Sequence, residues 1–260
     1  VPGNDSESER IIGRWMKARG NRDRVHILTK VGSDMGQGKT DLSAKWIEKA
    51  VEASLARLQT DYIDLYQSHW PDATVEQQET LEAYGRLVKA GKVRWIGASN
   101  YDEALLTEAL ATSAKLGLPR YETLQNEYNL YTRDKYEGAV QSLVLKEGLS
   151  LIPYYSLAAG FLTGKYRSES DLGKSARGED IAQYLNARGL RILAALDVIA
   201  ANTHVTPAEV ALAWVSAQPG VVGPLASATS VAQLESLARG AHLTLTADDL
   251  ATLTASGAGA

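Results

Sequence analysis

Cysteine is absent from this chain of 260 residues, phenylalanine occurs once and histidine four times. The lack of thiols excludes disulfide bonds, thiolate catalysis and thiolate metal sites. No apolar run approaches the ~18 residues that a membrane-spanning helix needs. The polar opening "VPGNDSESER" contains no signal-peptide core. A cytoplasmic protein is therefore expected, with no membrane contact and no metal site.

An excess of basic residues is also lacking. The net charge is −4, and no dense Lys/Arg cluster provides the footprint of a nucleic-acid or membrane surface. Hydrophobic residues make up 45% of the chain and charged residues 22%, the usual balance of a soluble globular protein. This composition can bury a large core, and one domain spanning residues 1–260 is expected.

Short β-branched or aromatic runs alternate along the chain with amphipathic stretches. "DLSAKWIEKAVEASLARL" places its apolar residues at spacings of three and four, which indicates a helix. Further helices are expected in "ETLEAYGRLVKAGKV", "DEALLTEALATSAKLGLP" and "TPAEVALAWVSAQPG", which carry helix caps and stops. The expected strands cover residues 25–30, 63–69, 93–100, 122–130, 149–157 and 220–228.

Alternating strands and helices predict an α/β fold with parallel strands, as an open doubly wound sheet or a (β/α)8 TIM barrel. The glycine-rich "GSDMGQGKT" does not have the spacing of a phosphate loop, so a surface loop is expected there. Polar residues collect at the carboxyl ends of successive strands, which favours the barrel, whose active sites lie on that rim. These residues are Lys30, His69, Ser99, Asn100, Gln125, Tyr155, Ser156 and Ser227.

Lys30 and His69 end the first two expected strands. Alone, Lys30 is compatible with a lysine that reaches solvent, and His69 with a histidine packed in the barrel wall. Neighbouring parallel strands lie about 5 Å apart, so together the two side chains can reach one small ligand. An ammonium and a neutral imidazole suit polarisation of a carbonyl group whose oxygen gains negative charge.

The later strand ends suit a nicotinamide dinucleotide. Ser99, Asn100 and Gln125 carry hydroxyl and amide groups that suit a carboxamide, and Tyr155 offers a ring for stacking. The segment "ASATS" precedes an expected helix, whose N-terminus would bind a phosphate.

Ordered motifs give the chain a family resemblance. They are "ILTKVG", "DLYQSHWPD", "GKVRWIGASNY", "LQNEYNL", "PYYSLAAGFLTGKY" and "ASATSVAQLE". With them the chain resembles the aldo-keto reductases, in particular their bacterial branch: NADPH-dependent oxidoreductases on a (β/α)8 barrel that reduce aldehyde or ketone carbonyls to alcohols. The likeness runs from the first residues to about Leu250.

The resemblance implies roles for individual residues. Lys30 and His69 would be catalytic, Trp70 would wall the substrate pocket, and Tyr155 would stack on the nicotinamide. The remaining cofactor positions would be Ser99, Asn100 and Gln125 at the carboxamide, Ser156, Leu157, Gly160 and Lys165 at the pyrophosphate, and Ser227, Thr229, Ser230 and Gln233 at the adenosine phosphate.

Two departures from the family pattern bear on these expectations. The family's proton-donating tyrosine and its supporting aspartate precede a loop resembling "VPGNDSESE", with which this chain opens. The resemblance therefore predicts a barrel whose first two strands, aspartate and tyrosine are absent from this chain. Ser230 and Gln233 stand where many relatives have basic residues at the 2′-phosphate, although Arg177 would supply charge nearby. NADPH is the expected cofactor, and NADH is possible.

Two rival functions follow from the same residues. Lys30 would serve as a Schiff-base lysine in a barrel aldolase, which borohydride trapping would reveal. Alternatively, the chain would be a non-catalytic barrel module that binds a nicotinamide cofactor. A small-molecule carbonyl substrate is the expected partner, and the sequence leaves its identity and the oligomeric state open.

Overall fold

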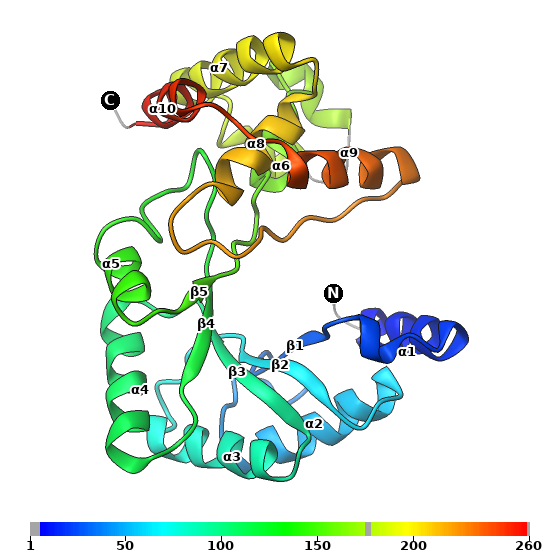
Figure 1. Ribbon diagram of the computed structural model, residues 1–260, viewed down its shortest axis with the longest axis vertical. Helices are drawn as coiled ribbons and strands as arrows, with labels where there is room; N and C mark the ends of the chain where they lie inside the picture. Colours follow the sequence, from blue (N-terminus) through cyan, green and yellow to red (C-terminus); the bar gives the residue numbers. More distant parts are fainter. Residues whose placement is uncertain (1–5, 175–177, 259–260) are drawn as a thin grey trace. The chain divides into compact units, whose positions relative to one another are not determined.

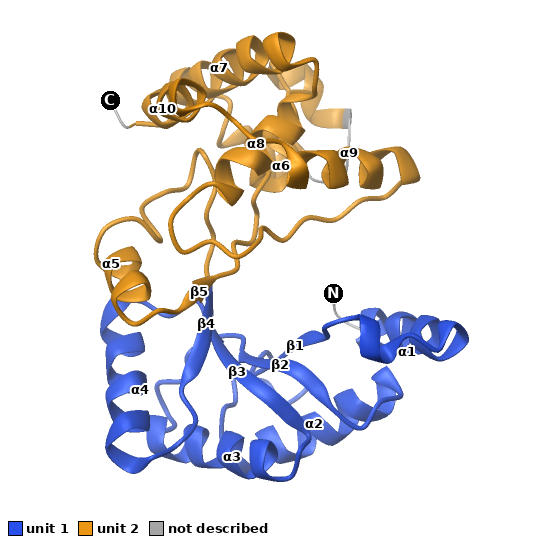
Figure 2. Ribbon diagram, viewed as in Figure 1, with its two compact units in different colours: residues 1–125 blue, residues 126–260 orange. Residues whose placement is uncertain are grey.

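The computed structural model describes residues 6–174 and 178–258. The chain divides into two compact units, residues 1–125 and 126–260, and each unit is described by itself (Figure 2). The expectation of a single domain over residues 1–260 stays a prediction.

Unit 1 alternates strands with helices along the chain (Figure 1). Its elements are α1 (Glu7–Arg19), the 3₁₀ turn η1 (Arg22–Arg24), β1 (Leu28–Val31), α2 (Ala44–Leu58), β2 (Ile63–Ser68), α3 (Gln77–Lys89), β3 (Val93–Ser99), α4 (Glu103–Leu116) and β4 (Tyr121–Gln125). The strands pair in chain order and all in parallel, β1 with β2, β2 with β3 and β3 with β4. The helices pack in the same order, α1 on α2, α2 on α3 and α3 on α4. The prediction of an α/β fold with parallel strands is confirmed.

The expected helices form because their ends are capped. Ser43 accepts a hydrogen bond from the backbone N–H of Trp46 at the start of α2, and Asp102 accepts one from Leu105 at the start of α4. Gly117 ends α4 with φ 63°, a left-handed conformation that glycine adopts without steric cost. Both helices are confirmed: α2 was predicted from the spacing of its apolar residues, and α4 from its stop at Gly117.

The sheet of unit 1 has two distinct faces. The ring of Tyr66 lies edge-on to that of Tyr84 in α3, with 6.0 Å between centroids, and Ser68 Oγ lies 2.8 Å from Tyr84 OH. Side chains alternate along a strand, so Gln67 and the following His69 point to the opposite face. Lys30 stands beside Gln67 in the register and shares that face.

The first helix, α1, was not predicted, because its residues are mostly polar. It docks through buried Glu9, whose carboxylate accepts hydrogen bonds from Thr29 Oγ1 at 2.5 Å and from Arg57 Nε at 2.6 Å. Gly13 allows the close approach, since a Cβ atom there would lie 2.4 Å from the backbone oxygen of Arg57. The helix is therefore held by one buried carboxylate, one glycine and the buried side chain of Met16 rather than by a continuous apolar stripe.

Unit 2 is mainly helical. It contains α5 (Ala139–Lys146), β5 (Ser150–Leu151), the 3₁₀ turns η2 (Ala158–Thr163) and η3 (Glu169–Lys174), α6 (Gly178–Ala182), α7 (Ala187–Thr203), α8 (Pro207–Ser216), α9 (Val231–His242) and α10 (Ala247–Ser256). A capping box between Thr206 and Glu209, with Pro207 in the first turn, starts α8 as predicted. No helix within the described residues combines the length and the apolar character needed to cross a bilayer.

Two expected strands of unit 2 are much shorter than predicted. Of residues 149–157 only Ser150–Leu151 form a strand, and of residues 220–228 only Val221 forms a bridge, to Leu151. The two segments still run side by side, since Leu225 donates from its backbone N–H to the oxygen of Pro153 at 2.8 Å. Pro153 and Pro224 have no N–H to donate, and this interrupts the ladder.

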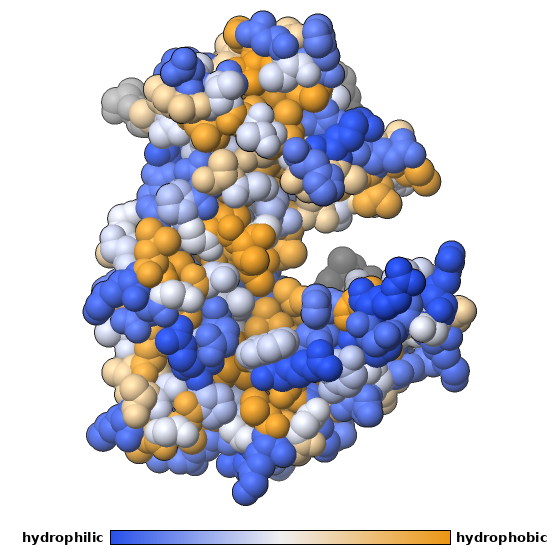
Figure 3. Space-filling model, in the orientation of Figure 1, coloured by the Kyte–Doolittle hydropathy of each residue, from blue (hydrophilic) through white to orange (hydrophobic). Residues whose placement is uncertain are grey.

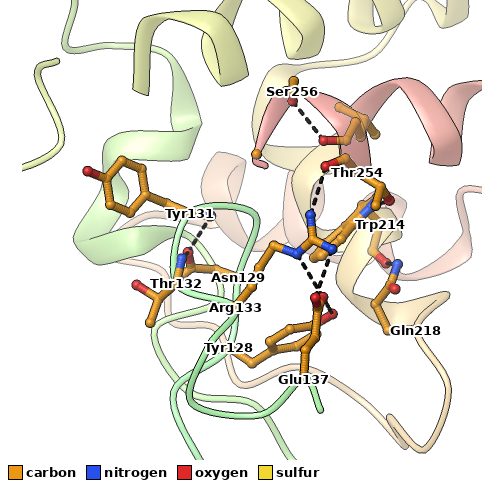
Figure 4. A network of polar contacts seen from close by, with 12 residues as sticks. Tyr128, Asn129, Tyr131, Thr132, Arg133, Glu137, Trp214, Gln218, Thr254 and Ser256 are labelled. Carbon is orange, nitrogen blue, oxygen red and sulfur yellow. Dashed lines mark hydrogen bonds and ion pairs between the residues drawn. The ribbon is translucent and has the colours of Figure 1, made fainter. Parts of the chain in front are cut away.

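A polar network ties the turn after residue 130 to α8 and α10 (Figure 4). Arg133 donates two hydrogen bonds to the Glu137 carboxylate, at 2.7 and 2.8 Å, and one to the backbone oxygen of Thr254 at 2.7 Å. Tyr128 donates to Glu137 at 2.8 Å, and buried Trp214 donates to Thr254 Oγ1 at 3.0 Å. The side-chain polar groups of Tyr128, Arg133 and Glu137 are all hydrogen-bonded, and the bond from Arg133 to Thr254 attaches the turn to α10.

Candidate active site

Lys30 lies half-buried near the carboxyl end of β1. No carboxylate of the described residues forms an ion pair with its ammonium group. Burial lowers the pKa of Lys30 from its ordinary value, because a low-dielectric environment disfavours the charged form. The strand therefore presents a cation whose charge the described carboxylates do not neutralise.

His69 follows β2 directly and is fixed through its backbone, its ring edge and its ring face. Its backbone N–H donates to the oxygen of Val31 at 2.8 Å. Its Nδ1 lies 2.6 Å from Ser33 Oγ, and its ring stacks on Trp70 with 5.7 Å between centroids and 11° between planes. Few orientations of the imidazole satisfy all of these contacts.

The electrostatics keep His69 neutral. Burial, and then the positive charge of Lys30, lower the pKa of His69 to about 4. At pH 7 the ring is therefore an uncharged imidazole with one N–H donor and one acceptor nitrogen. The influence of Lys30 on this pKa also shows that the two predicted catalytic residues are electrostatic neighbours.

Ser99, Asn100 and Gln125 form a hydrogen-bonded cluster at the carboxyl ends of β3 and β4. The Ser99 hydroxyl donates to the backbone oxygen of Gln125 at 2.8 Å, and the backbone N–H of Asn100 donates to the same oxygen at 3.1 Å. The side-chain amide of Asn100 donates to the backbone oxygen of His69 at 2.9 Å and to Ser99 Oγ at 3.2 Å. The structure thus brings these three predicted residues together with His69.

Asn100 adopts a left-handed backbone conformation with φ 61°. Asparagine tolerates this region better than most residues, although it still costs free energy relative to the right-handed region. The turn brings the amide of Asn100 back to the end of the preceding strand.

Trp70, the predicted wall of the substrate pocket, is 45% exposed and therefore accessible beside the His69 ring.

In unit 2, Tyr155 also has a positive φ, of 52°, and its side chain is 56% exposed. Its backbone oxygen accepts hydrogen bonds from the buried Asn129 amide at 3.0 Å and from the N–H of Ala158 at 2.7 Å. Such a conformation persists only where the surroundings determine it, and it is enriched at ligand sites. The tyrosine ring is exposed and available for stacking.

The predicted pyrophosphate residues surround a tight turn. Ala158, Ala159 and Gly160 all have positive φ, at 48°, 57° and 104°. Ser156 is buried, and its hydroxyl donates to the backbone oxygen of Pro153 at 3.2 Å, so its side chain serves the turn itself. Leu157 accepts backbone hydrogen bonds from Gly160 and Leu162, and exposed Lys165 lies with Nζ 4.9 Å from the Tyr166 ring centroid.

The predicted phosphate residues begin α9. Ser230 is its N-cap and accepts a hydrogen bond from the backbone N–H of Gln233 at 3.3 Å. Gln233 Oε1 accepts from the backbone N–H and the hydroxyl of Thr229, at 2.8 and 3.0 Å. Ser227 lies in the exposed approach to the helix. These side chains fix the N-terminus of α9, whose free N–H groups are suited to an anion.

Apolar side chains near this helix are exposed as well. Val222, Val231 and Leu234 are all exposed, and apolar residues gather at the tip where α9 begins (Figure 3). Arg177, the predicted source of positive charge, lies outside the described residues.

Sequence reasoning missed two residues of this site. Ser33, next to His69, belongs to the glycine-rich segment that was interpreted only as a surface loop. Buried Asn129, which holds the backbone of Tyr155, lies inside the motif "LQNEYNL" but was given no role. The motif itself was the only signal for Asn129, because its neighbours in the segment are mostly polar as well. Nothing in the spacing pointed to Ser33.

Comparisons with known proteins show which family the chain is similar to. The aldo/keto reductase family model matches residues 4–258. The chain is 35% identical to the aldo-keto reductase YhdN of Bacillus subtilis (strain 168), covering 94% of this chain and 73% of that protein. It is 29% identical to the NADP(+) aldo-keto reductase yakc of Schizosaccharomyces pombe, covering 88% of this chain and 68% of that one. A thermostable aldo-keto reductase solved with the inhibitor epalrestat matches with a TM-score of 0.77 and 27% identity, over 96% of this chain and 78% of that one.

Proposed function

The chain belongs to the aldo/keto reductase family of oxidoreductases, and on that premise we propose that it reduces small aldehyde or ketone carbonyls to alcohols with NADPH. The observation that carries the proposal is the neutral, oriented imidazole of His69 beside the ammonium group of Lys30. A histidine that stays neutral at pH 7 can donate its ring N–H to the substrate oxygen while carrying no positive charge of its own.

His69 and Lys30 act on the substrate oxygen. His69 donates its ring N–H to the carbonyl oxygen and orients it. The charge of Lys30 stabilises the negative charge that develops on that oxygen during reduction. Preorganised groups of this kind contribute most in a site where water is scarce. Trp70, stacked on His69, forms one wall of the substrate position.

The residues also fit a nicotinamide cofactor, which supplies the hydride when it is bound. In unit 1, Ser99, Asn100 and Gln125 would hold its carboxamide. The resemblance to the family assigns Tyr155 and the turn around Gly160, which belong to unit 2, to the nicotinamide ring and the pyrophosphate. The fit rests on the positive φ of Tyr155, which its hydrogen bonds from Asn129 and Ala158 maintain.

The adenosine phosphate would lie at the start of α9. The helix N-terminus favours an anion, and the capping by Ser230 and Gln233 keeps it formed. Hydroxyl and amide groups hold a phosphate less strongly than a guanidinium group does. We therefore expect NADPH to be preferred over NADH by a modest factor.

The test of the main function is spectrophotometric. Loss of nicotinamide absorbance is measured with NADPH and a panel of aromatic aldehydes and small ketones, with the His69→Ala protein as control. Turnover that depends on His69 supports the reductase. Cofactor binding without turnover by any panel member would favour the non-catalytic nicotinamide-binding module instead.

A further inference from the structure

Ser33 lies 2.6 Å from the Nδ1 atom of His69, measured from its Oγ. This is a short hydrogen-bond distance. Within the described residues, Ser33 is the hydrogen-bond partner of the imidazole ring. It belongs to the segment Gly32 to Thr40, which none of the roles above involves. The contact joins the loop after β1 to the histidine after β2.

The loop is built to hold this serine. Gly32 turns the chain away from β1 with φ 105°, which glycine adopts without strain. The Gln37 amide donates to the backbone oxygen of Ser33 at 2.8 Å and accepts from the N–H of Met35 at 2.7 Å. Asp34 Oδ1 accepts hydrogen bonds at 2.9 Å from the backbone N–H groups of Gly36 and Gly38. Ser33 therefore lies in a turn that hydrogen bonds of the Asp34 and Gln37 side chains stabilise.

Resting on the proposed function, we infer that Ser33 is a positioning residue that donates its hydroxyl proton to Nδ1 of His69 and so keeps the imidazole proton on Nε2. A neutral imidazole has one donor and one acceptor nitrogen, and the partner of one nitrogen decides the state of the other. A hydroxyl can donate or accept a hydrogen bond, and in this bond the Ser33 hydroxyl is the donor. With the proton on Nε2, the ring offers its donor to the carbonyl oxygen.

The first test does not depend on catalysis. Nitrogen-15 NMR of the cofactor-free protein at pH 7.5 reports which imidazole nitrogen carries the proton. The four histidines keep the spectrum simple, and the His69→Gln protein identifies the His69 signal. We expect the Nε2–H form in the wild type and a mixture of both forms in Ser33→Ala. Ser33→Thr, which keeps the hydroxyl, should restore the Nε2–H form.

The second test measures rates. Ser33→Ala should lower kcat about 10-fold, the usual scale for a residue that orients a functional group, with little change in the KM for NADPH. Ser33→Thr should recover most of the loss. Ser8→Ala removes an exposed hydroxyl in α1 and should have the wild-type kcat and spectrum.

The two tests fail independently. If the wild-type protein shows no turnover, the proposed function fails, while loss of the Nε2–H form in Ser33→Ala still supports the inference. A wild-type ring protonated on Nδ1 overturns the inference whatever the rates. An unchanged His69 spectrum in Ser33→Ala overturns it as well.

Discussion

The side-chain amide of Asn100 donates a hydrogen bond to the backbone oxygen of His69 across 2.9 Å. The residue after β3 therefore fixes the residue after β2. Asn100 makes this contact from a left-handed conformation with φ 61°, so its backbone and its side chain both contribute to the geometry.

Substitution of Asn100 separates these two contributions. Asn100→Gly removes the amide but keeps the freedom to adopt a positive φ, whereas Asn100→Ala removes the amide and adds about 1–2 kcal/mol of backbone strain. We expect kcat to fall about 10-fold in both proteins, and the melting temperature to fall further in Asn100→Ala. Equal melting temperatures would show that the left-handed turn does not constrain this position.

His69→Ala and Lys30→Met should each lower kcat/KM by about 10²-fold, or roughly 2.7 kcal/mol of transition-state stabilisation. Their melting temperatures should change little, because neither side chain belongs to the packed apolar core. The measurement is steady-state kinetics beside thermal unfolding. A large loss of stability with unchanged kinetics would instead make His69 a structural residue.

The pH dependence of stability should carry the signature of His69. Its pKa is about 4 in the folded protein, against about 6.5 in an unfolded chain. Above pH 6.5 the His69 ring is neutral in both the folded and the unfolded state, and the stability that depends on the neutral ring is fully present. Between pH 6.5 and 4 the unfolded chain takes up a proton that the folded protein does not, so this stability is lost as the pH falls.

We therefore expect the melting temperature of the wild type to fall more steeply than that of His69→Gln between pH 7 and 4.5. Asp64 and Glu209, whose pKa values are also lowered, titrate in both proteins and cancel in the difference. Parallel profiles would mean that the folded pKa of His69 lies near its ordinary value.

The part of this site that the sequence predicts well is the set of strand ends. Lys30, His69, Ser99 and Gln125 are separated in sequence, but parallel strands deliver their carboxyl ends to one edge. A period of two along each strand then decides which side chains share a face. Local pattern and general topology were sufficient here.

The misses have different physical causes. Residues 220–228 have the composition of a strand, but Pro224 and the facing Pro153 remove the donors that a ladder needs. The helix α1 depends on a tertiary contact, the carboxylate of Glu9 on Arg57, which no local periodicity reveals. Ser33 reaches His69 through the path of a loop, and loop paths are set by backbone conformation rather than by composition.

The network around Arg133 predicts a stability effect in unit 2. Glu137→Ala would remove the acceptor of the Tyr128 hydroxyl and leave Arg133 with the backbone oxygen of Thr254 as its one acceptor among the described residues. We expect a loss of about 2–3 kcal/mol in the free energy of unfolding, measured in urea. Lys146→Ala breaks an exposed ion pair and should change it by less than about 0.5 kcal/mol. Equal effects of the two substitutions would mean that the network adds no more than a surface pair.

Alanine substitutions of Gly97 and Gly85 form a matched pair that tests the packing inside unit 1. In the register of the sheet, Gly97 stands between Gln67 of β2 and Thr123 of β4, on the face that Lys30 shares. A Cβ atom at Gly97 would lie 2.3 Å from Thr123 Oγ1 and 3.1 Å from Gln67 Cγ. An alanine methyl group therefore has no room there unless the Thr123 side chain or its strand moves.

Gly97→Ala should lower the free energy of unfolding by about 1–3 kcal/mol through this overpacking, measured by urea denaturation. Gly85→Ala should raise it by about 0.5–1 kcal/mol, because Gly85 lies inside α3 and its nearest neighbour would be Pro119 Cδ at 3.4 Å. Adding Thr123→Ala to Gly97→Ala removes the clashing hydroxyl and should restore part of the loss. If Gly97→Ala is as stable as Gly85→Ala, the side chains of Thr123 and Gln67 do not crowd position 97 as the register of the three strands implies.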